Sequence, residues 1–154
     1  MYTFFYLSDD LREYMNYTSS KSTFGVTTTN QVIDGLYEHT NAPEFDQVCF
    51  HSARSVGEWW KVHFIERVAI VKVHFYNRKD CCTERSNNLL IKAVTNTNGV
   101  ATETLCVNTG IMENIPDKIF HCETPGTLAD EIKVINEIYE FLNVCEVIVY
   151  GWVL

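Results

Sequence analysis

Short segments in which apolar and polar residues alternate recur through the middle of the chain. In one of them Val71, Val73 and Phe75 are separated by single residues, which is the period-two pattern of a strand with one buried face. Segments of strand character run over 59–64, 71–76, 89–94, 100–107 and, ended by glycine, 145–151. Several short strands separated by polar turns predict a β-sandwich.

A second pattern competes with strands between Asp130 and Leu142. Ile132, Ile135 and Ile138 recur at the spacing of one helix face. The β-branched residues in the same segment, Ile132 and Val134 among them, favour a strand instead. The spacing alone predicts a helix here.

Length and composition indicate a single globular domain over 1–154. Hydrophobic residues make up 46% and charged residues 21% of the chain, and a domain of 154 residues buries roughly 70% of its unfolded surface. Glycine and proline are scarce, and no run of them forms a linker that would divide the chain.

The charge balance is acidic, with 12 basic and 20 acidic residues and a net charge of −8. This charge repels phosphate backbones and anionic lipids, so we expect no nucleic-acid partner. No apolar run is long enough to span a bilayer, and we expect no direct membrane insertion. Residues 1–7 lack the basic flank and cleavage site of a complete signal peptide, which leaves open a mature secreted form and a chain that was never secreted.

The number of cysteines is even, which suggests disulfides and an oxidising compartment. The six are Cys49, Cys81, Cys82, Cys106, Cys122 and Cys145. Their spacing leaves the pairing open, and buried reduced thiols are the alternative. No pair has the Cys-x-x-Cys spacing of zinc or thioredoxin-like sites.

Cys81 and Cys82 are adjacent and lie just after a predicted strand that ends near Asn77, so they are expected on a loop. A bond between them would close a strained small ring, because neighbouring Cα atoms lie closer together than ordinary disulfides require. Two free thiols, or bonds to other cysteines, are the alternatives. If formed, the ring would be a stiff, apolar plate at the loop tip.

Two arginines flank this pair. Arg78 and Arg85 each present a planar fork of donors that can bridge two neighbouring hydroxyl groups, and Asp80 can hold one guanidinium in place. Taken alone, these residues also fit a solvated turn with a surface ion pair. His51, two residues after Cys49, is by itself more typical of a structural histidine than of a site.

The order and spacing of His51, Arg78, Asp80 and Arg85 change that interpretation. A histidine followed at this distance by Arg-x-Asp-x-x-x-x-Arg is the fucose-binding pattern of the F-type lectins, the fucolectin family. Further stretches resemble the family, namely Cys49-Phe50-His51-Ser52, Trp59-Trp60-Lys61-Val62, Tyr76-Asn77-Arg78, Cys145-Glu146-Val147 and Val149-Tyr150-Gly151. The resemblance covers about 10–151.

The resemblance implies an all-β fold, an eight-stranded jelly-roll β-sandwich of the discoidin-like, galactose-binding-domain-like type. This implication overrides the helical spacing noted between Asp130 and Leu142. It also implies three disulfides, which join Cys49 to Cys145, Cys81 to Cys82 and Cys106 to Cys122. The first and last are expected to be structural.

By resemblance, the ligand is L-fucose and the site has no catalytic role. His51, Arg78 and Arg85 are expected to bind the ring oxygen and the O3 and O4 hydroxyls, with Asp80 positioning an arginine. The Cys81–Cys82 plate is expected to pack on the apolar edge of the sugar ring. Phe45 is the candidate for contact with the C6 methyl group.

The family also implies a structural calcium ion near the site. Asp34 and Glu146 match its acidic ligands, Gln31, Leu36 and Cys145 offer backbone carbonyl oxygens, and Val48 stands at a further ligand position. The chain departs from the family at Leu36, where asparagine is usual, and at Val48, where serine is usual. Two side-chain oxygens are therefore missing, whereas calcium prefers about six to eight oxygens. We expect the ion to bind weakly, to take extra water, or to be absent.

The implied partners are fucosylated glycans on glycoproteins or cell surfaces, met by an extracellular, secreted protein. A homo-oligomer would raise avidity by presenting several sites. Two other classes stay open: a redox enzyme that uses Cys81 and Cys82 as a couple, and a discoidin-like adhesion module that binds protein or lipid.

Overall fold

The computed structural model describes residues 8–36 and 48–154, and its regular elements are strands and short 3-10 helices. The strands are β1 (Asp9–Asp10), β2 (Met15–Ser20), β3 (Phe50–Tyr76), β4 (Leu90–Thr97), β5 (Val100–Asn108), β6 (Asp117–His121), β7 (Thr127–Val144) and β8 (Glu146–Val153). The 3-10 helices are η1 (Arg12–Tyr14), η2 (Thr29–Val32) and η4 (Thr83–Ser86). Across these described residues, no helix combines the length and the apolar character needed to cross a membrane. The expected all-β class with eight strands is confirmed.

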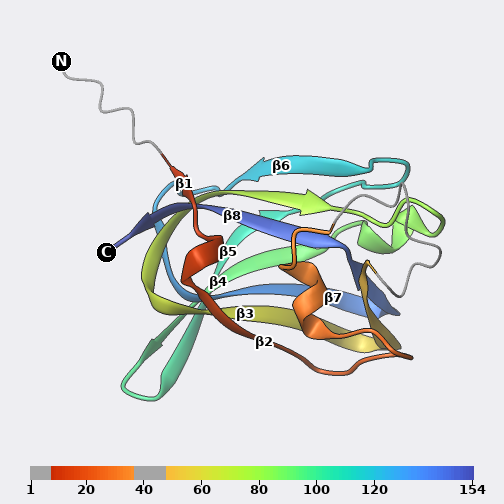
Figure 1. Ribbon diagram of the computed structural model, residues 1–154, viewed down its shortest axis with the longest axis horizontal. Helices are drawn as coiled ribbons and strands as arrows, with labels where there is room; N and C mark the ends of the chain where they lie inside the picture. Colours follow the sequence, from red (N-terminus) through yellow and green to blue (C-terminus); the bar gives the residue numbers. More distant parts are fainter. Residues whose placement is uncertain (1–7, 37–47) are drawn as a thin grey trace.

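The 27-residue strand β3 takes part in both layers of the sandwich. Its first half pairs antiparallel with β2 and β7, and its second half pairs with β6 and β8. Beyond these, β4 and β5 extend the layer of β7, while β1 extends the layer of β8. Figure 1 shows β3 curving from one layer to the other at one end of the molecule. Both ends of β3 therefore meet at the opposite end of the sandwich.

Alternation along β3 builds the core. Trp60, Val62 and Phe64 are buried between the layers, while Lys61 and His63 are partly exposed. The segments 59–64 and 71–76 that the pattern predicted as separate strands are two parts of this one strand. The predictions for 89–94, 100–107 and 145–151 correspond to β4, β5 and β8. The pattern did not predict β1, β2 or β6.

The segment between Asp130 and Leu142 lies inside β7, so the helix that its spacing predicts is wrong and the strand implied by the family resemblance is confirmed. The helical spacing joined residues that face different ways: Ile132 is buried, whereas Ile138 and Tyr139 are 64% and 62% exposed. The pairing with β3 shifts register around Gly57, which has a φ of 71°. A bulge at that point breaks the strict alternation of a strand and imitates a helical period.

The three disulfides expected from the resemblance are present: Cys49–Cys145, Cys81–Cys82 and Cys106–Cys122. The first closes a long loop, with a sequence separation of 96, and it lies in a small apolar cluster that includes Val48 and Tyr76. In the chain-entropy model a loop of this length stabilises the fold by roughly 4 to 5 kcal/mol. This disulfide also joins the residue before β3 to the residue before β8, and the Cys145 amide donates to the carbonyl oxygen of Tyr76, the last residue of β3, at 3.1 Å.

Candidate functional site

A single buried amide fixes both ends of the loop from Arg78 to Arg85. The side-chain nitrogen of Asn77 donates to the carbonyl oxygens of Thr83 at 3.0 Å and Met112 at 3.2 Å, and a third carbonyl lies at 3.3 Å. Its side-chain oxygen accepts from the Arg78 amide and the Ser86 hydroxyl, each at 2.8 Å. Asn77 is fully buried, so these bonds are shielded from water and hold the loop on the end of β3.

The vicinal disulfide forms the tip of this loop. The Cα atoms of Cys81 and Cys82 are 3.8 Å apart, and Cys81 is exposed. Cys82 has a φ of 60°, in the left-handed region that residues other than glycine rarely adopt. Cys82 directly precedes η4 as its N-cap residue, and the Arg85 amide donates to the Cys82 carbonyl oxygen at 3.1 Å. The strained residue thus directs the chain back so that Arg85 returns toward the sandwich.

Arg78 and Asp80 form a two-pronged ion pair on the loop. The guanidinium donates from Nε to Oδ1 at 2.7 Å and from an Nη to Oδ2 at 2.9 Å. These bonds hold the pKa of Asp80 below its ordinary value. The Arg78 side chain is only 13% exposed, so Asp80 orients a largely covered guanidinium, as the sequence predicted.

Arg85 is held against β7. Its guanidinium carbon lies 4.6 Å from the centre of the Phe141 ring, a cation–π geometry. Glu140 and Asn143 flank it, with Nε of Arg85 3.7 Å from the Glu140 carboxylate and an Nη 3.4 Å from the Asn143 side-chain oxygen. The Asn143 amide nitrogen is buried and has no hydrogen-bond partner within the described part of the chain.

His51, near the start of β3, forms the other side of the candidate site. Its ring centre is 4.8 Å from Phe141 and 5.1 Å from Phe24, and Nδ1 lies 2.7 Å from the Ser52 carbonyl oxygen. Nδ1 can bond that carbonyl only as a donor, so the geometry favours the tautomer with the proton on Nδ1 and leaves Nε2 as an acceptor. Thr27 Oγ1 contacts the His51 backbone at both its carbonyl oxygen and its nitrogen.

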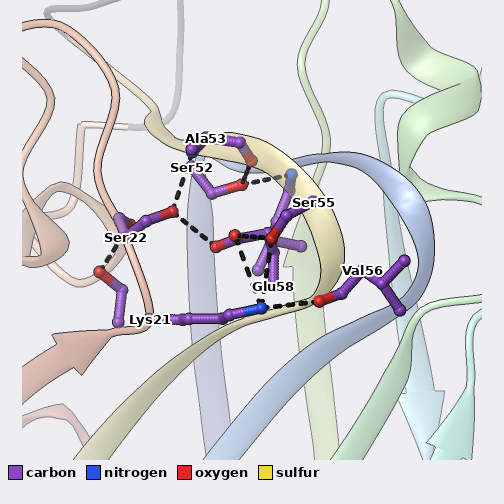
Figure 2. Close-up of polar contacts among 9 residues, drawn as sticks. Lys21, Ser22, Ser52, Ala53, Ser55, Val56 and Glu58 are labelled. Carbon is purple, nitrogen blue, oxygen red and sulfur yellow. Dashed lines mark hydrogen bonds and ion pairs between the residues drawn. The ribbon is translucent and has the colours of Figure 1, made fainter.

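A polar network anchors the segment that carries Phe24 (Figure 2). The buried Glu58 accepts from the Ser22 hydroxyl at 2.6 Å and from the Ser55 hydroxyl, and the Ala53 amide donates to Ser22 at 3.0 Å. Lys21 donates to the Val56 carbonyl oxygen at 2.7 Å. These contacts fix the chain just before Phe24, whose amide donates to the His51 carbonyl oxygen at 2.8 Å.

The two arginines border separate hollows. Arg85 lies in the wall of a cavity of about 470 Å³ whose other lining side chains are mainly amides and carboxylates, including Asn88, Asn108 and Glu137. Arg78 borders a more open hollow of about 320 Å³ together with Asn114. A polar end surface with two orientated guanidinium groups can bind a small polyhydroxylated ligand through directional hydrogen bonds.

Phe141 is the residue that sequence reasoning missed, and it connects the two sides of the site. Its ring lies against both His51 and Arg85. Register explains the placement, since β7 pairs with β3 through His51 opposite Asn143 and Arg54 opposite Phe141. Phe24 was missed in the same way. Phe45, the predicted contact for a methyl group, lies outside the described residues.

The side chains at the six positions expected to hold calcium supply few oxygens, and from Gln31, Leu36 and Cys145 the resemblance implies backbone carbonyl oxygens only. Asp34 and Glu146 carry carboxylates, but Leu36 points an apolar side chain outward with 61% exposure. Val48 packs in the apolar cluster beside Cys145. Gln31 uses its side-chain oxygen to accept from the Thr28 amide at 2.6 Å, which caps η2. Among the described residues, no group of three or more His, Cys, Asp or Glu side chains could hold a metal. These residues do not fit a calcium site held by protein side chains.

The carboxylates of this region are instead close to Arg12. Burial raises the pKa of Glu146, and the Arg12 guanidinium opposes part of that rise. Burial also raises the pKa of Asp34, against a bond from the Leu36 amide and the charge of Arg12. Both shifts have the same physical cause, the removal of a carboxylate from water.

Comparison with known proteins finds relatives of this chain among the fucolectins. No family model matches the chain, but Fucolectin-5 of Anguilla japonica is 32% identical over 101 residues, which are 64% of this chain and 52% of that protein. Fucolectin of Anguilla anguilla is 32% identical over the same length and is covered to 63%. The chain is thus similar in sequence to the fucolectins, or F-type lectins, over 64% of its length. It spans about half the length of several fucolectins that it matches.

Solved structures of an F-lectin and of a fucose binding module have the same fold as this chain. The F-lectin from Morone saxatilis serum has a TM-score of 0.75 at 22% identity, over 96% of this chain and 50% of that one. A fucose binding module of Streptococcus pneumoniae has a TM-score of 0.72 at 20% identity, over 99% of this chain and all of that one. The F-type lectin fold therefore accounts for nearly the whole chain, and these relatives are described as binding proteins and not as enzymes.

Proposed function

We propose that this domain is a lectin that binds L-fucose and fucosylated glycans through His51, Arg78 and Arg85, with the Cys81–Cys82 disulfide as an apolar surface. The observation that carries the proposal is that His51 and Arg85 share one aromatic neighbour, and that the loop leading to Arg85 also carries Arg78. Phe141 lies against both His51 and Arg85, and Arg78 lies on the loop that returns to Arg85. The names of the related lectins and fucose-binding modules support the same ligand class.

The chemistry of the three side chains suits a sugar with an axial hydroxyl. Each guanidinium can donate two parallel hydrogen bonds to neighbouring oxygens, and a histidine with the proton on Nδ1 can accept a hydroxyl proton at Nε2. A site built around one hydroxyl leaves its own polar groups unpaired when the sugar directs that hydroxyl elsewhere. The site should therefore discriminate by hydroxyl orientation more strongly than by a single methyl group.

In this proposal the Cys81–Cys82 disulfide contacts the sugar and takes no part in redox chemistry. Cys81 is exposed beside the arginines, so its sulfur can contact the apolar edge of a sugar ring. A redox couple would instead need an activating group for an attacking thiolate. The neighbouring charged groups, Arg78 and Asp80, are bound to each other. The geometry thus favours binding over redox chemistry.

The proposal extends to where and how the lectin acts. Three disulfides suit an oxidising, extracellular environment, and glycans on glycoproteins or cell surfaces are the corresponding ligands. A single small site binds a monosaccharide weakly, with a Kd in the range from about 1 mM to about 1 µM. Several copies on one surface, for example in a homo-oligomer, would then supply avidity.

Calorimetric titration of the purified domain tests the proposal. L-Fucose should bind in the stated range, L-galactose should bind more weakly because it has a hydroxymethyl group in place of the C6 methyl group, and D-mannose should not bind. The disulfide-intact protein, checked by mass, is used for every sugar. Equal affinities for fucose and mannose would refute a fucose-specific site.

A further inference from the structure

Three segments meet at the buried carboxylate of Glu146, the first residue of β8. A guanidinium nitrogen of Arg12, in η1, lies 3.1 Å from Oε1 of Glu146. The amide of Gly35, just after η2, lies 3.3 Å and 3.2 Å from the two carboxylate oxygens. Glu146 has no exposed surface, whereas Arg12 reaches it from a position that is 35% exposed. A guanidinium therefore lies at one carboxylate oxygen, and a backbone N–H group lies near both.

The guanidinium is fitted closely into this place. A methyl group added at Gly35 would lie 2.8 Å from an Nη atom of Arg12, which is shorter than real contacts allow. Gly35 has a φ of 80°, which also disfavours a side chain. A side chain at residue 35 would therefore displace the end of the Arg12 side chain from its present position beside Glu146.

The same place is where the family resemblance predicts calcium, and two of its side-chain oxygens are missing at Leu36 and Val48. A divalent cation at the Glu146 carboxylate would meet the Arg12 guanidinium at close range, and two like charges repel there. We propose that Arg12 is the resident cation of this site and ties η1, the segment after η2 and β8 together in place of calcium. This inference concerns stability and does not rest on the sugar specificity proposed above.

Thermal unfolding with and without metal provides the test on the unaltered chain. The Tm of the wild type should be the same in EDTA and in millimolar calcium chloride, because no ion adds to the folded state. Calcium that bound the folded state well below its working concentration would raise the Tm by several degrees. A calcium-dependent rise of that size in the wild type would overturn the proposal.

The Arg12→Ala variant gives the complementary measurement. Removing one partner of a buried ion pair leaves a carboxylate without compensation, and the Tm should fall by on the order of 5 to 10 °C in EDTA. Arg12→Lys, which keeps a positive charge, should recover part of that loss. The matched control is Arg67→Ala, since Arg67 is 36% exposed and pairs with Asp130 at 2.7 Å but at a partly exposed site. Its Tm should fall by at most about 3 °C.

The coupling between the two partners distinguishes a specific tie from general loss of packing. Glu146→Gln removes the negative charge and keeps the shape of the side chain. The double variant Arg12→Ala, Glu146→Gln should lose less Tm than the sum of the two single variants. Additive losses, or an Arg12→Ala variant that melts like the Arg67→Ala control, would show that Arg12 is not the cation of this site.

Discussion

The two sides of the candidate sugar site are held in place by different means. The loop side places Arg78, the disulfide and Arg85 close together in sequence and is fixed chiefly by the buried amide of Asn77. The strand side consists of His51, whose neighbours Phe24 and Phe141 come from distant segments. The conformation of one loop thus positions the hydrogen-bond donors, Arg78 and Arg85, whereas the register between strands positions the proposed acceptor, His51. The two sides should respond differently to substitution.

Removing the loop arginines should have the largest effect on binding. Arg78→Ala and Arg85→Ala each delete charge-assisted hydrogen bonds worth about 1.5 to 3 kcal/mol, so the Kd for fucose should rise about 10-fold to 100-fold. Isothermal titration measures this change, and the Tm should stay within about 3 °C of the wild type. Lys79→Ala, an exposed neighbour on the same loop, is the control. Wild-type affinity in both arginine variants would place the site elsewhere.

Asn77→Ala tests whether one amide supports the whole loop side. The variant leaves buried carbonyl oxygens without a donor, and it removes the acceptor of the Arg78 amide and the Ser86 hydroxyl. We expect a loss of about 2 to 4 kcal/mol in the free energy of unfolding, measured with urea, and weaker fucose binding. Asn96→Ala, at an exposed position, should change neither. An Asn77→Ala variant with the wild-type free energy of unfolding would show that the loop from Arg78 to Arg85 does not depend on this amide.

Phe141→Ala tests the strand side and should have a smaller effect on binding. The variant removes the ring beneath Arg85 and beside His51 but leaves every proposed polar contact with the sugar in place. A cation–π contact and an aromatic pair together predict a Kd about 5-fold higher. Tyr139→Ala, two residues away and 62% exposed, is the control. If Phe141→Ala abolished binding, the strand side and not the loop side would be the principal determinant of affinity.

The smallest effect concerns the protonation of Asp80. Its bond to Arg78 lowers the pKa in the folded state below the ordinary value of 3.8. The stability that this pair contributes is therefore present above pH 3.8 and is lost as the pH falls through the lowered folded-state pKa. A carbon-13 NMR titration of the Asp80 carboxyl should show a midpoint below 3.8 that rises in Arg78→Ala. The same midpoint in both proteins would mean that the ion pair does not form in solution.

The loop side could be read from the sequence because its information is local. Arg78, Asp80 and Arg85 keep their spacing on one loop, and the adjacent cysteines need no fold to be neighbours. The strand side could not be read in this way, since Phe141 reaches His51 only through the register between β3 and β7. Register depends on bulges, such as the one around Gly57, which apolar spacing does not reveal.

The fold shows the same difference between features that local sequence predicts and features that depend on contacts distant in sequence. Regular alternation predicted the parts of β3 that follow it, and the family resemblance corrected the helical spacing between Asp130 and Leu142. Neither indicated Arg12, because a lone arginine in a short 3-10 turn has no periodic signal. Its contact with Glu146 joins positions far apart in sequence and depends on the shape of the chain at Gly35. Contacts of this kind require the folded structure.

The most direct test of the central claim follows the side chains themselves while fucose is added. Nitrogen-15 NMR can observe the Nε–Hε groups of the arginines and the ring nitrogens of His51 in one titration. Saturation with L-fucose should shift the signals of Arg78, Arg85 and His51 and leave Arg67, which is bound to Asp130 at the partly exposed ion pair, unchanged. If fucose binds while the signals of Arg78, Arg85 and His51 stay in place, the sugar occupies another site and the claim is wrong.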